Sequence, residues 1–181
     1  DMRPYFKGYI SFKLKGKWGI MLSNGPGDPS DNTKIIQEIA KLCESNIPIF
    51  GICLGHQLLA LARGATTSKL KYGHRGGNHP VKELETGRVY ITSHKHGYAV
   101  EAQSLPSFAK MSCMNVNDGT CEGVKYCDIP AFSVQFHPEA CGGPKAVSYT
   151  LLTLPTILRV TISDVCPTCI QEKITQITDK L

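Results

Sequence analysis

The feature that most constrains the fold is the short segment Gly51-Ile-Cys-Leu-Gly55. The apolar run 47–53 leads into it, and residues 55–63 continue as a helix-like stretch. A glycine two residues before and two residues after Cys53 is typical of a sharp strand-to-helix turn, where side chains would clash with adjacent backbone. The segment therefore predicts an α/β fold in which Cys53 stands above one edge of a sheet.

The flanking sequence repeats this order of elements. Residues 18–22 form a short apolar run, residues 24–29 are dense in turn formers, and residues 32–43 have apolar positions on one helical face. Strand, helix, strand and helix in succession predict a mainly parallel sheet. Residues 1–16 show no clear period, and residues 70–81, rich in Gly and His, predict a loop with short strands. Further strands are expected at 88–92, 98–101, 109–116, 121–126 and 131–135.

Bulk composition favours a soluble domain. Of the 181 residues, 41% are hydrophobic and 19% charged, and the net charge of +5 comes without a dense basic stripe. No run approaches the roughly 20 apolar residues of a membrane span, so we expect a cytoplasmic protein that binds neither membrane nor nucleic acid. The eight cysteines are scattered, which favours reduced thiols over a disulfide framework. Cys166 and Cys169 form a C-x-x-C without two further ligands nearby, so chance or a redox pair is favoured and no metal site is predicted.

Cys53 has the setting of a nucleophile. The N-terminus of the following helix favours the thiolate, and its first backbone N–H groups point toward any oxyanion formed there. A small buried core cysteine is the alternative interpretation. The strand–turn–helix context favours the nucleophile.

A proton carrier is predicted at His137, which follows the strand 131–135. In a parallel sheet this places it at the same edge as Cys53, and Glu139 stands two residues on to orient the imidazole. A surface-loop histidine is the alternative, and five other histidines exist, so position and the glutamate select His137. The turn Gly25-Pro-Gly27 meets the same edge and offers backbone N–H groups; alternatively it is a plain β-turn.

Together these residues resemble the class I, triad-type glutamine amidotransferases, most closely the glutaminase small subunit or domain of carbamoyl-phosphate synthetases. The resemblance spans Gly19 to Lys145. It is carried by Leu22-Ser-Asn-Gly-Pro-Gly-Asp-Pro29, Gly51-Ile-Cys-Leu-Gly-His-Gln-Leu-Leu-Ala60, Lys71-Tyr-Gly-His-Arg-Gly-Gly-Asn-His-Pro-Val81, Thr92-Ser-His-Lys-His-Gly-Tyr-Ala-Val100 and Phe136-His-Pro-Glu139. It implies a flavodoxin-like amidotransferase domain.

The resemblance also implies roles. Cys53 would attack the glutamine side-chain amide, release ammonia and form a glutamyl thioester, with His137 and Glu139 completing the triad. Gly27 and Leu54 would supply the oxyanion hole. The domain would need no cofactor, and a large synthetase subunit using bicarbonate, ATP and Mg would receive the ammonia to make carbamoyl phosphate for pyrimidine or arginine biosynthesis. Glutamine-contacting positions fall on Gly25, Gly27, Leu54, Gln57, Lys95, Gly97 and Tyr98.

Two departures from the family pattern stand out. The family usually has Gln-Asn where this chain has His94-Lys95. Lys95 offers a cationic donor that weakens glutamine binding, pairs with the substrate carboxylate or swings to solvent. Residues 1–18 are poorly matched and too short to replace the family's preceding strand, helix and domain, which predicts a domain truncated at both ends.

The remaining segment changes character after Lys145. Residues 146–181 resemble the conceptual translation of a transposase sequencing adapter, with Leu151 as a mismatch, and are predicted to be a non-native tail. The alternative is an ordinary strand and terminal helix. The predicted organisation is thus residues 1–18, an amidotransferase domain over 19–145, and the tail.

Two other functions share the same residues. One is a catalytically weak or inactive module that docks on the synthetase. The other is a hydrolase of a different γ-glutamyl substrate, which would share the triad but not explain the segment 71–81.

Overall fold

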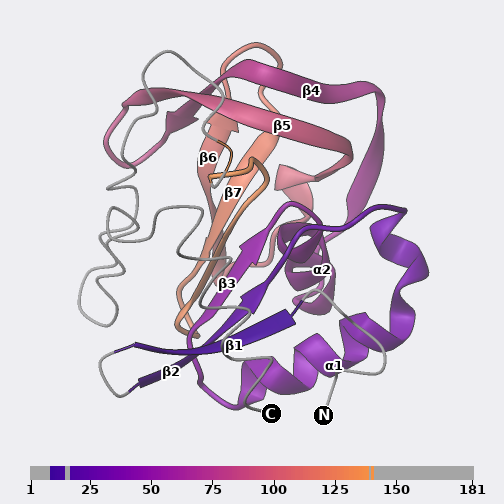
Figure 1. The fold of residues 1–181 in the computed structure, drawn as a ribbon, viewed down its shortest axis with the longest axis vertical. Coiled ribbons are helices and arrows are strands. Elements are labelled where there is room, and N and C mark those ends of the chain that lie inside the picture. The colour runs from indigo at the N-terminus through magenta and orange to yellow at the C-terminus, as the bar shows by residue number, and fades with distance from the viewer. Residues whose placement is uncertain (1–8, 15–16, 139, 141–181) are drawn as a thin grey trace. The chain divides into compact units, whose positions relative to one another are not determined.

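The computed structural model describes residues 9–14, 17–138 and 140. The elements discussed below belong to one compact unit that ends at His137 (Figure 1). The predicted tail 146–181 and the catalytic candidate Glu139 lie outside the described residues. In the part of the chain that is described, no helix is both long and apolar enough to cross a membrane.

The first half alternates strands and helices, as the sequence predicts. Strand β2 (Lys17–Leu22) is followed by the 3₁₀ turn η1 (Pro29–Asp31) and helix α1 (Thr33–Glu44). Strand β3 (Ile49–Ile52) then leads into helix α2 (Leu54–Ala62). Each predicted element is present within two residues of its expected bounds. Strand β1 (Tyr9–Leu14) falls where the sequence shows no periodicity and was not predicted.

The second half consists of strands. These are β4 (Thr67–Glu83), β5 (Val89–Val100), β6 (Ala109–Asn115), β7 (Cys121–Tyr126) and β8 (Ala131–Val134), with the 3₁₀ turn η2 (Ala102–Ser104) after β5. Residues 70–81, predicted as a loop with short strands, lie inside β4. The glycines there sit in a long ribbon whose register shifts twice, between Lys69 and His74 and between Gly76 and His79. These irregularities explain why no strand period is visible in the sequence.

Within the described residues, eight strands join one sheet in the order β1-β2-β3-β8-β7-β5-β4-β6. Among these described strands, β2–β3 and β3–β8 pair in parallel, and the other pairs are antiparallel. The prediction of a mainly parallel sheet is therefore wrong: the sheet is mixed. The strands after α2 are joined largely without helical crossovers, and direct connections favour antiparallel pairing.

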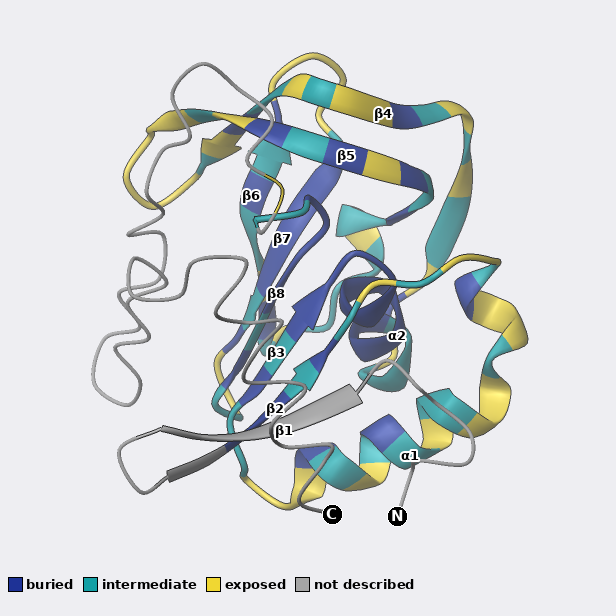
Figure 2. Cartoon of the chain, in the orientation of Figure 1, coloured by how far each residue is buried: buried dark blue, intermediate teal, exposed yellow. Residues whose placement is uncertain are grey.

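Buried residues concentrate on the inner strands of the sheet and on α2 (Figure 2), and their apolar side chains form two clusters. The larger one packs α1 and α2 against the sheet through fully buried side chains such as Ile39, Leu58 and Leu22. The smaller one contains Ile52, Cys53, Val134 and Phe136. Burial of Cys53 in the second cluster fixes the position of the turn between β3 and α2 within the unit.

Candidate active site

The turn between β3 and α2 has the strained geometry expected of a nucleophile elbow. Cys53 has a φ of 51°, in a region that L side chains rarely occupy, and its N–H donates to the Val134 carbonyl at 3.0 Å. A Cβ on Gly55 would lie 2.1 Å from the Leu22 carbonyl oxygen, and one on Gly51 would lie 2.8 Å from the Gly55 oxygen. Both glycines are required because backbone packs directly on backbone here.

A cavity of about 380 Å³ opens beside this turn. Cys53 lines this cavity but is largely buried, with 4% of its surface exposed. The lining residues come from the loop after β2, from the elbow, from β4 and β5, and from the segment after β8. They are Asn24, Gly25, Pro26, Cys53, Arg75, Lys95, His96, Gly97 and His137.

His137 lines the same cavity as Cys53, at the sheet edge where the sequence predicts that both lie. Its backbone N–H donates to the Ser93 carbonyl at 2.9 Å, which ties the segment after β8 to strand β5. Strand β8 pairs in parallel with β3, with Val134 opposite Ile52, so both strands deliver their next residues to one edge. The predicted nucleophile and proton carrier are thus brought together by a single strand pair.

The predicted oxyanion-hole residues lie next to the lining. Gly27 follows Pro26 and has a φ of +103°, and Leu54 follows Cys53 as the first residue of α2. A Cβ on Gly25 would lie 2.7 Å from Leu54 Cδ2, so the Gly-Pro-Gly turn sits directly on the start of the helix. The two segments are therefore adjacent, although neither Gly27 nor Leu54 lines the cavity itself.

Gln57 differs most from its expected role. This side chain is 3% exposed, and its Nε2 donates to the Tyr98 carbonyl at 2.8 Å and to Gln135 Oε1 at 2.9 Å. It therefore links α2 to β5 and to the segment after β8 rather than lining the cavity. Tyr98 does not line it either: its side chain hydrogen-bonds Asp28, and that bond raises the pKa of Tyr98. Of the predicted glutamine contacts, Gly25, Lys95 and Gly97 line the cavity.

Sequence reasoning did not single out three lining groups, Arg75, Asn24 and His96. Arg75 lies directly opposite Lys95 in the β4–β5 register, so two cations face the same space. Arg75 also donates from Nη1 to the Tyr72 carbonyl at 2.8 Å. Burial lowers the pKa of His96 to about 4, so this imidazole is neutral at physiological pH. These residues could have been found only from the pairing of β4 with β5. That register could not be inferred, because residues 70–81 of β4 are predicted as a loop with short strands.

The family model for class-I glutamine amidotransferases matches residues 7–152, well over half the chain. The chain belongs to the class I glutamine amidotransferases. Among curated relatives of this amidotransferase, the carbamoyl phosphate synthase small chain of Symbiobacterium thermophilum is 54% identical over 132 residues. That of Lactococcus lactis subsp. cremoris is 55% identical over 131 residues. Each match covers 72% of this chain and 36% of the relative, so the chain spans about a third of their length.

Solved structures agree on the fold of this amidotransferase. A glutamine amidotransferase from Thermotoga maritima aligns with a TM-score of 0.56 and 25% identity, covering 65% of this chain and 54% of that one. A glutamine amidotransferase from Methylobacillus flagellatus aligns with a TM-score of 0.58 and 19% identity, covering 67% and 52%. The second likeness concerns the fold alone. The class I amidotransferase fold predicted from the sequence is confirmed.

Proposed function

We propose that this domain hydrolyses glutamine to glutamate and ammonia, with Cys53 as the nucleophile. The observation that carries the proposal is the shared cavity: Cys53, held at a strained elbow, and His137 both line it. A cavity of about 380 Å³ is of the size that binds small molecules. Two cations at one wall, Arg75 and Lys95, suit a substrate that carries a carboxylate.

The proposed reaction runs in two steps. The Cys53 thiolate attacks the side-chain amide carbon, and the oxygen becomes an oxyanion next to the backbone N–H groups of Gly27 and Leu54. His137 donates a proton to the nitrogen, the C–N bond breaks, and ammonia leaves a glutamyl thioester on Cys53. His137 then takes a proton from water, which attacks the thioester, breaks the C–S bond and releases glutamate. Glu139 would orient His137 throughout.

The ammonia is proposed to serve a carbamoyl-phosphate synthetase large subunit. This rests on the relatives, which are carbamoyl phosphate synthase small chains at 54–55% identity. In this proposal the large subunit, rather than the amidotransferase domain, uses ATP and Mg, and the pair works in the cytoplasm. The domain itself needs no cofactor for thioester chemistry.

The test is ammonia release by the purified chain, alone and with a large synthetase subunit, beside Cys53→Ala. We expect release from the parent chain and a loss on the order of 10⁴-fold or more in the variant, because the thioester cannot form. His137→Ala is the second arm and should lose activity comparably, since the two residues act as a unit.

Two outcomes separate the alternatives. No ammonia release under either condition would mean a docking module, provided that the chain still binds the large subunit. Faster turnover of another γ-glutamyl amide than of glutamine would reassign the substrate while leaving the Cys53 chemistry in place.

A further inference from the structure

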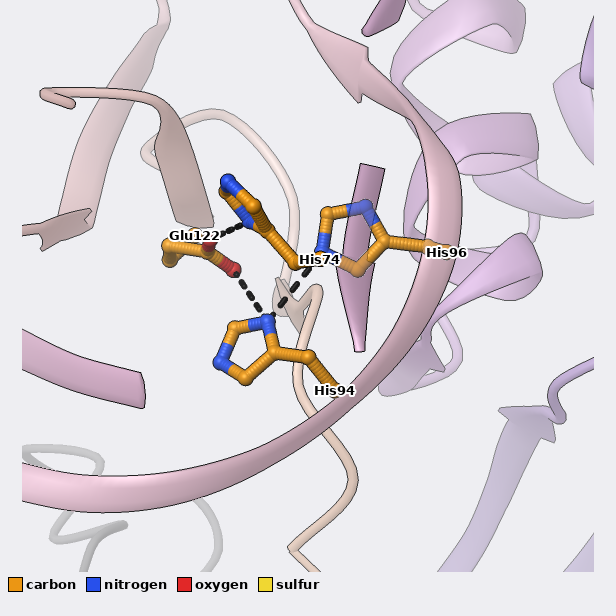
Figure 3. Close-up of side chains that lie close together, drawn as sticks. All are labelled: His74, His94, His96 and Glu122. Carbon is orange, nitrogen blue, oxygen red and sulfur yellow. Dashed lines mark hydrogen bonds and ion pairs between the residues drawn. The ribbon is translucent and has the colours of Figure 1, made fainter. Parts of the chain in front are cut away.

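A cluster of four potential metal ligands lies beside the candidate active site and has no part in the proposed reaction. His74 comes from β4, His94 and His96 from β5, and Glu122 from β7 (Figure 3). One ligand atom from each side chain lies within 4.8 Å of all the others. All four residues are buried, and the most exposed of them, His74, is 8% exposed.

The hydrogen-bond partners of His94 and His96 show which of their ring nitrogens carry hydrogen. The Thr92 hydroxyl donates to the His79 carbonyl at 2.9 Å, so at 2.7 Å it accepts from His94 Nε2. His96 Nδ1 donates to the Tyr98 carbonyl at 2.8 Å. In its neutral form each of these two rings holds a single hydrogen. His94 Nδ1 and His96 Nε2 are therefore both lone pairs, and they face each other at 3.1 Å.

The other two members add further acceptors. Glu122 is fully buried, and its Oε2 has no hydrogen-bond donor among the described residues, although it lies 3.5 Å from His94 Nδ1. His74 lies between two carboxylates, with Nε2 2.8 Å from Asp118 Oδ2 and Nδ1 3.1 Å from Glu122 Oε1, so both ring nitrogens donate and a bound cation would replace the hydrogen on Nδ1. Acceptor atoms thus converge from His94, His96 and Glu122, and His74 adds a fourth ligand once the cation replaces the hydrogen on its Nδ1.

We propose that His74, His94, His96 and Glu122 form a binding site for a divalent cation of the zinc class. Ligands at 2.0–2.2 Å from a tetrahedral zinc lie roughly 3.3 Å apart. Three facing pairs are separated by 3.1, 3.1 and 3.5 Å, and the four ligand atoms all lie within 4.8 Å of one another, so the more distant ligands would have to move inward by up to about 1.5 Å. Three imidazoles and one carboxylate suit zinc better than Mg²⁺ or Ca²⁺, which prefer oxygen ligands.

Each ligand also has an outer partner that fixes its orientation, as in established metal sites. The partners of the three imidazoles are the Asp118 carboxylate, the Thr92 hydroxyl and the Tyr98 carbonyl. Asn115 Nδ2 donates to Glu122 Oε1 at 3.2 Å. A shell of this kind orients lone pairs toward one point, which isolated surface histidines do not achieve.

The resemblance gives Gln as the usual family residue where this chain has His94, and Gln there would remove one nitrogen ligand. His96 also lines the cavity that contains Cys53. A bound cation would therefore hold one wall of the cavity in place, with His96 as a positioning residue.

The decisive measurement is Co²⁺ titration of the full chain, followed by visible absorption. Thiols that could compete are removed first, in a Cys53→Ala/Cys166→Ser/Cys169→Ser background. We expect one equivalent of Co²⁺ with the intense bands of tetrahedral coordination, displaced by Zn²⁺. His94→Gln should weaken binding at least about 100-fold, because it removes a direct ligand.

The matched control is His79→Gln. The His79 ring packs 5.1 Å from His74 and 4.7 Å from His94 but is not one of the four ligands, so Co²⁺ affinity should be unchanged. Zn²⁺ should also raise the melting temperature of the background chain but not that of His94→Gln.

Failure of the folded background chain to bind Co²⁺ or Zn²⁺ at micromolar concentration would overturn the proposal, as would affinity that survives His94→Gln. If that variant does not fold, X-ray absorption at the zinc edge of the background chain decides. Nitrogen and oxygen scatterers alone, with multiple scattering from imidazoles, support the site, whereas sulfur scatterers overturn it. Each readout is independent of glutaminase activity, so the site and the proposed function can fail separately.

Discussion

The turn at Cys53 and the β4–β5 ribbon face the same cavity but are specified in different ways. At the turn, the local sequence determines the conformation, because Gly51 and Gly55 leave room for close backbone contacts. A Cβ on Gly55 would lie only 2.1 Å from the Leu22 carbonyl oxygen. In the β4–β5 ribbon, the pairing register decides which side chains lie opposite one another. Arg75 opposes Lys95, and His74 opposes His96, only because β4 and β5 pair with two irregularities.

This difference has consequences for mutations. The turn is rigid and packed, so a single methyl group should disrupt it. Ribbon side chains such as Lys95 reach the cavity from an exposed position, so substitutions there should alter binding more than folding.

The largest expected effect is at the turn. Gly55→Ala should lower the free energy of unfolding by about 3 kcal/mol, because the new Cβ overlaps the Leu22 backbone. Urea unfolding monitored by circular dichroism measures the change.

Gly97→Ala is the matched control in the ribbon. A Cβ there meets nothing within 4 Å, so stability should change by less than about 1 kcal/mol. If Gly55→Ala and Gly97→Ala lowered the free energy of unfolding equally, the turn would be no more tightly packed than the ribbon.

The next largest effect on stability is expected at Gln57, whose side chain links α2 to β5. Gln57→Leu should lower the free energy of unfolding by about 2 kcal/mol, because it leaves Gln135 Oε1 and the Tyr98 carbonyl without this donor. Hydrogen exchange should show greater opening of β5 next to α2.

Gln103→Leu provides the comparison, since that exposed amide donates to the nearby Glu101 carboxylate at 3.0 Å and bridges no distant elements. It should be nearly neutral. A Gln57→Leu variant of unchanged stability but raised KM for glutamine would instead restore the role that the resemblance implied.

The smallest expected effect is at Lys95. Lys95→Met should raise KM for glutamine about fivefold with little change in kcat, because one of two cations facing the cavity is lost. Steady-state ammonia release measures it.

Lys110→Met, an exposed lysine on β6 that does not line the cavity, should leave KM unchanged. Unchanged KM in Lys95→Met would show that Lys95 points to solvent. Lys95→Asn, the usual family residue, then reports whether a neutral donor binds glutamine better.

Much of the first half could be predicted from the sequence. The helices α1 and α2 and strands β2 and β3 follow apolar runs and turn residues that act locally. The meeting of Cys53 and His137 at one sheet edge also follows from the sequence, because both come after strands, and the structure adds that both line one cavity.

The ribbon could not be predicted in the same way. Residues 70–81 have no regular alternation, since β4 changes register twice. The same irregularity hid the cluster of His74, His94, His96 and Glu122, although His94 and His96 are two residues apart on one face of β5.

By itself, the sequence determined the elbow, the helices and the meeting of Cys53 and His137 at one edge, because glycine sterics and hydrophobic periodicity are local properties. The tertiary structure decided that the sheet is mixed, that Gln57 links elements instead of lining the cavity, and that Arg75 and Lys95 face one space. These features depend on cross-strand register, which long-range packing sets and which no local pattern records.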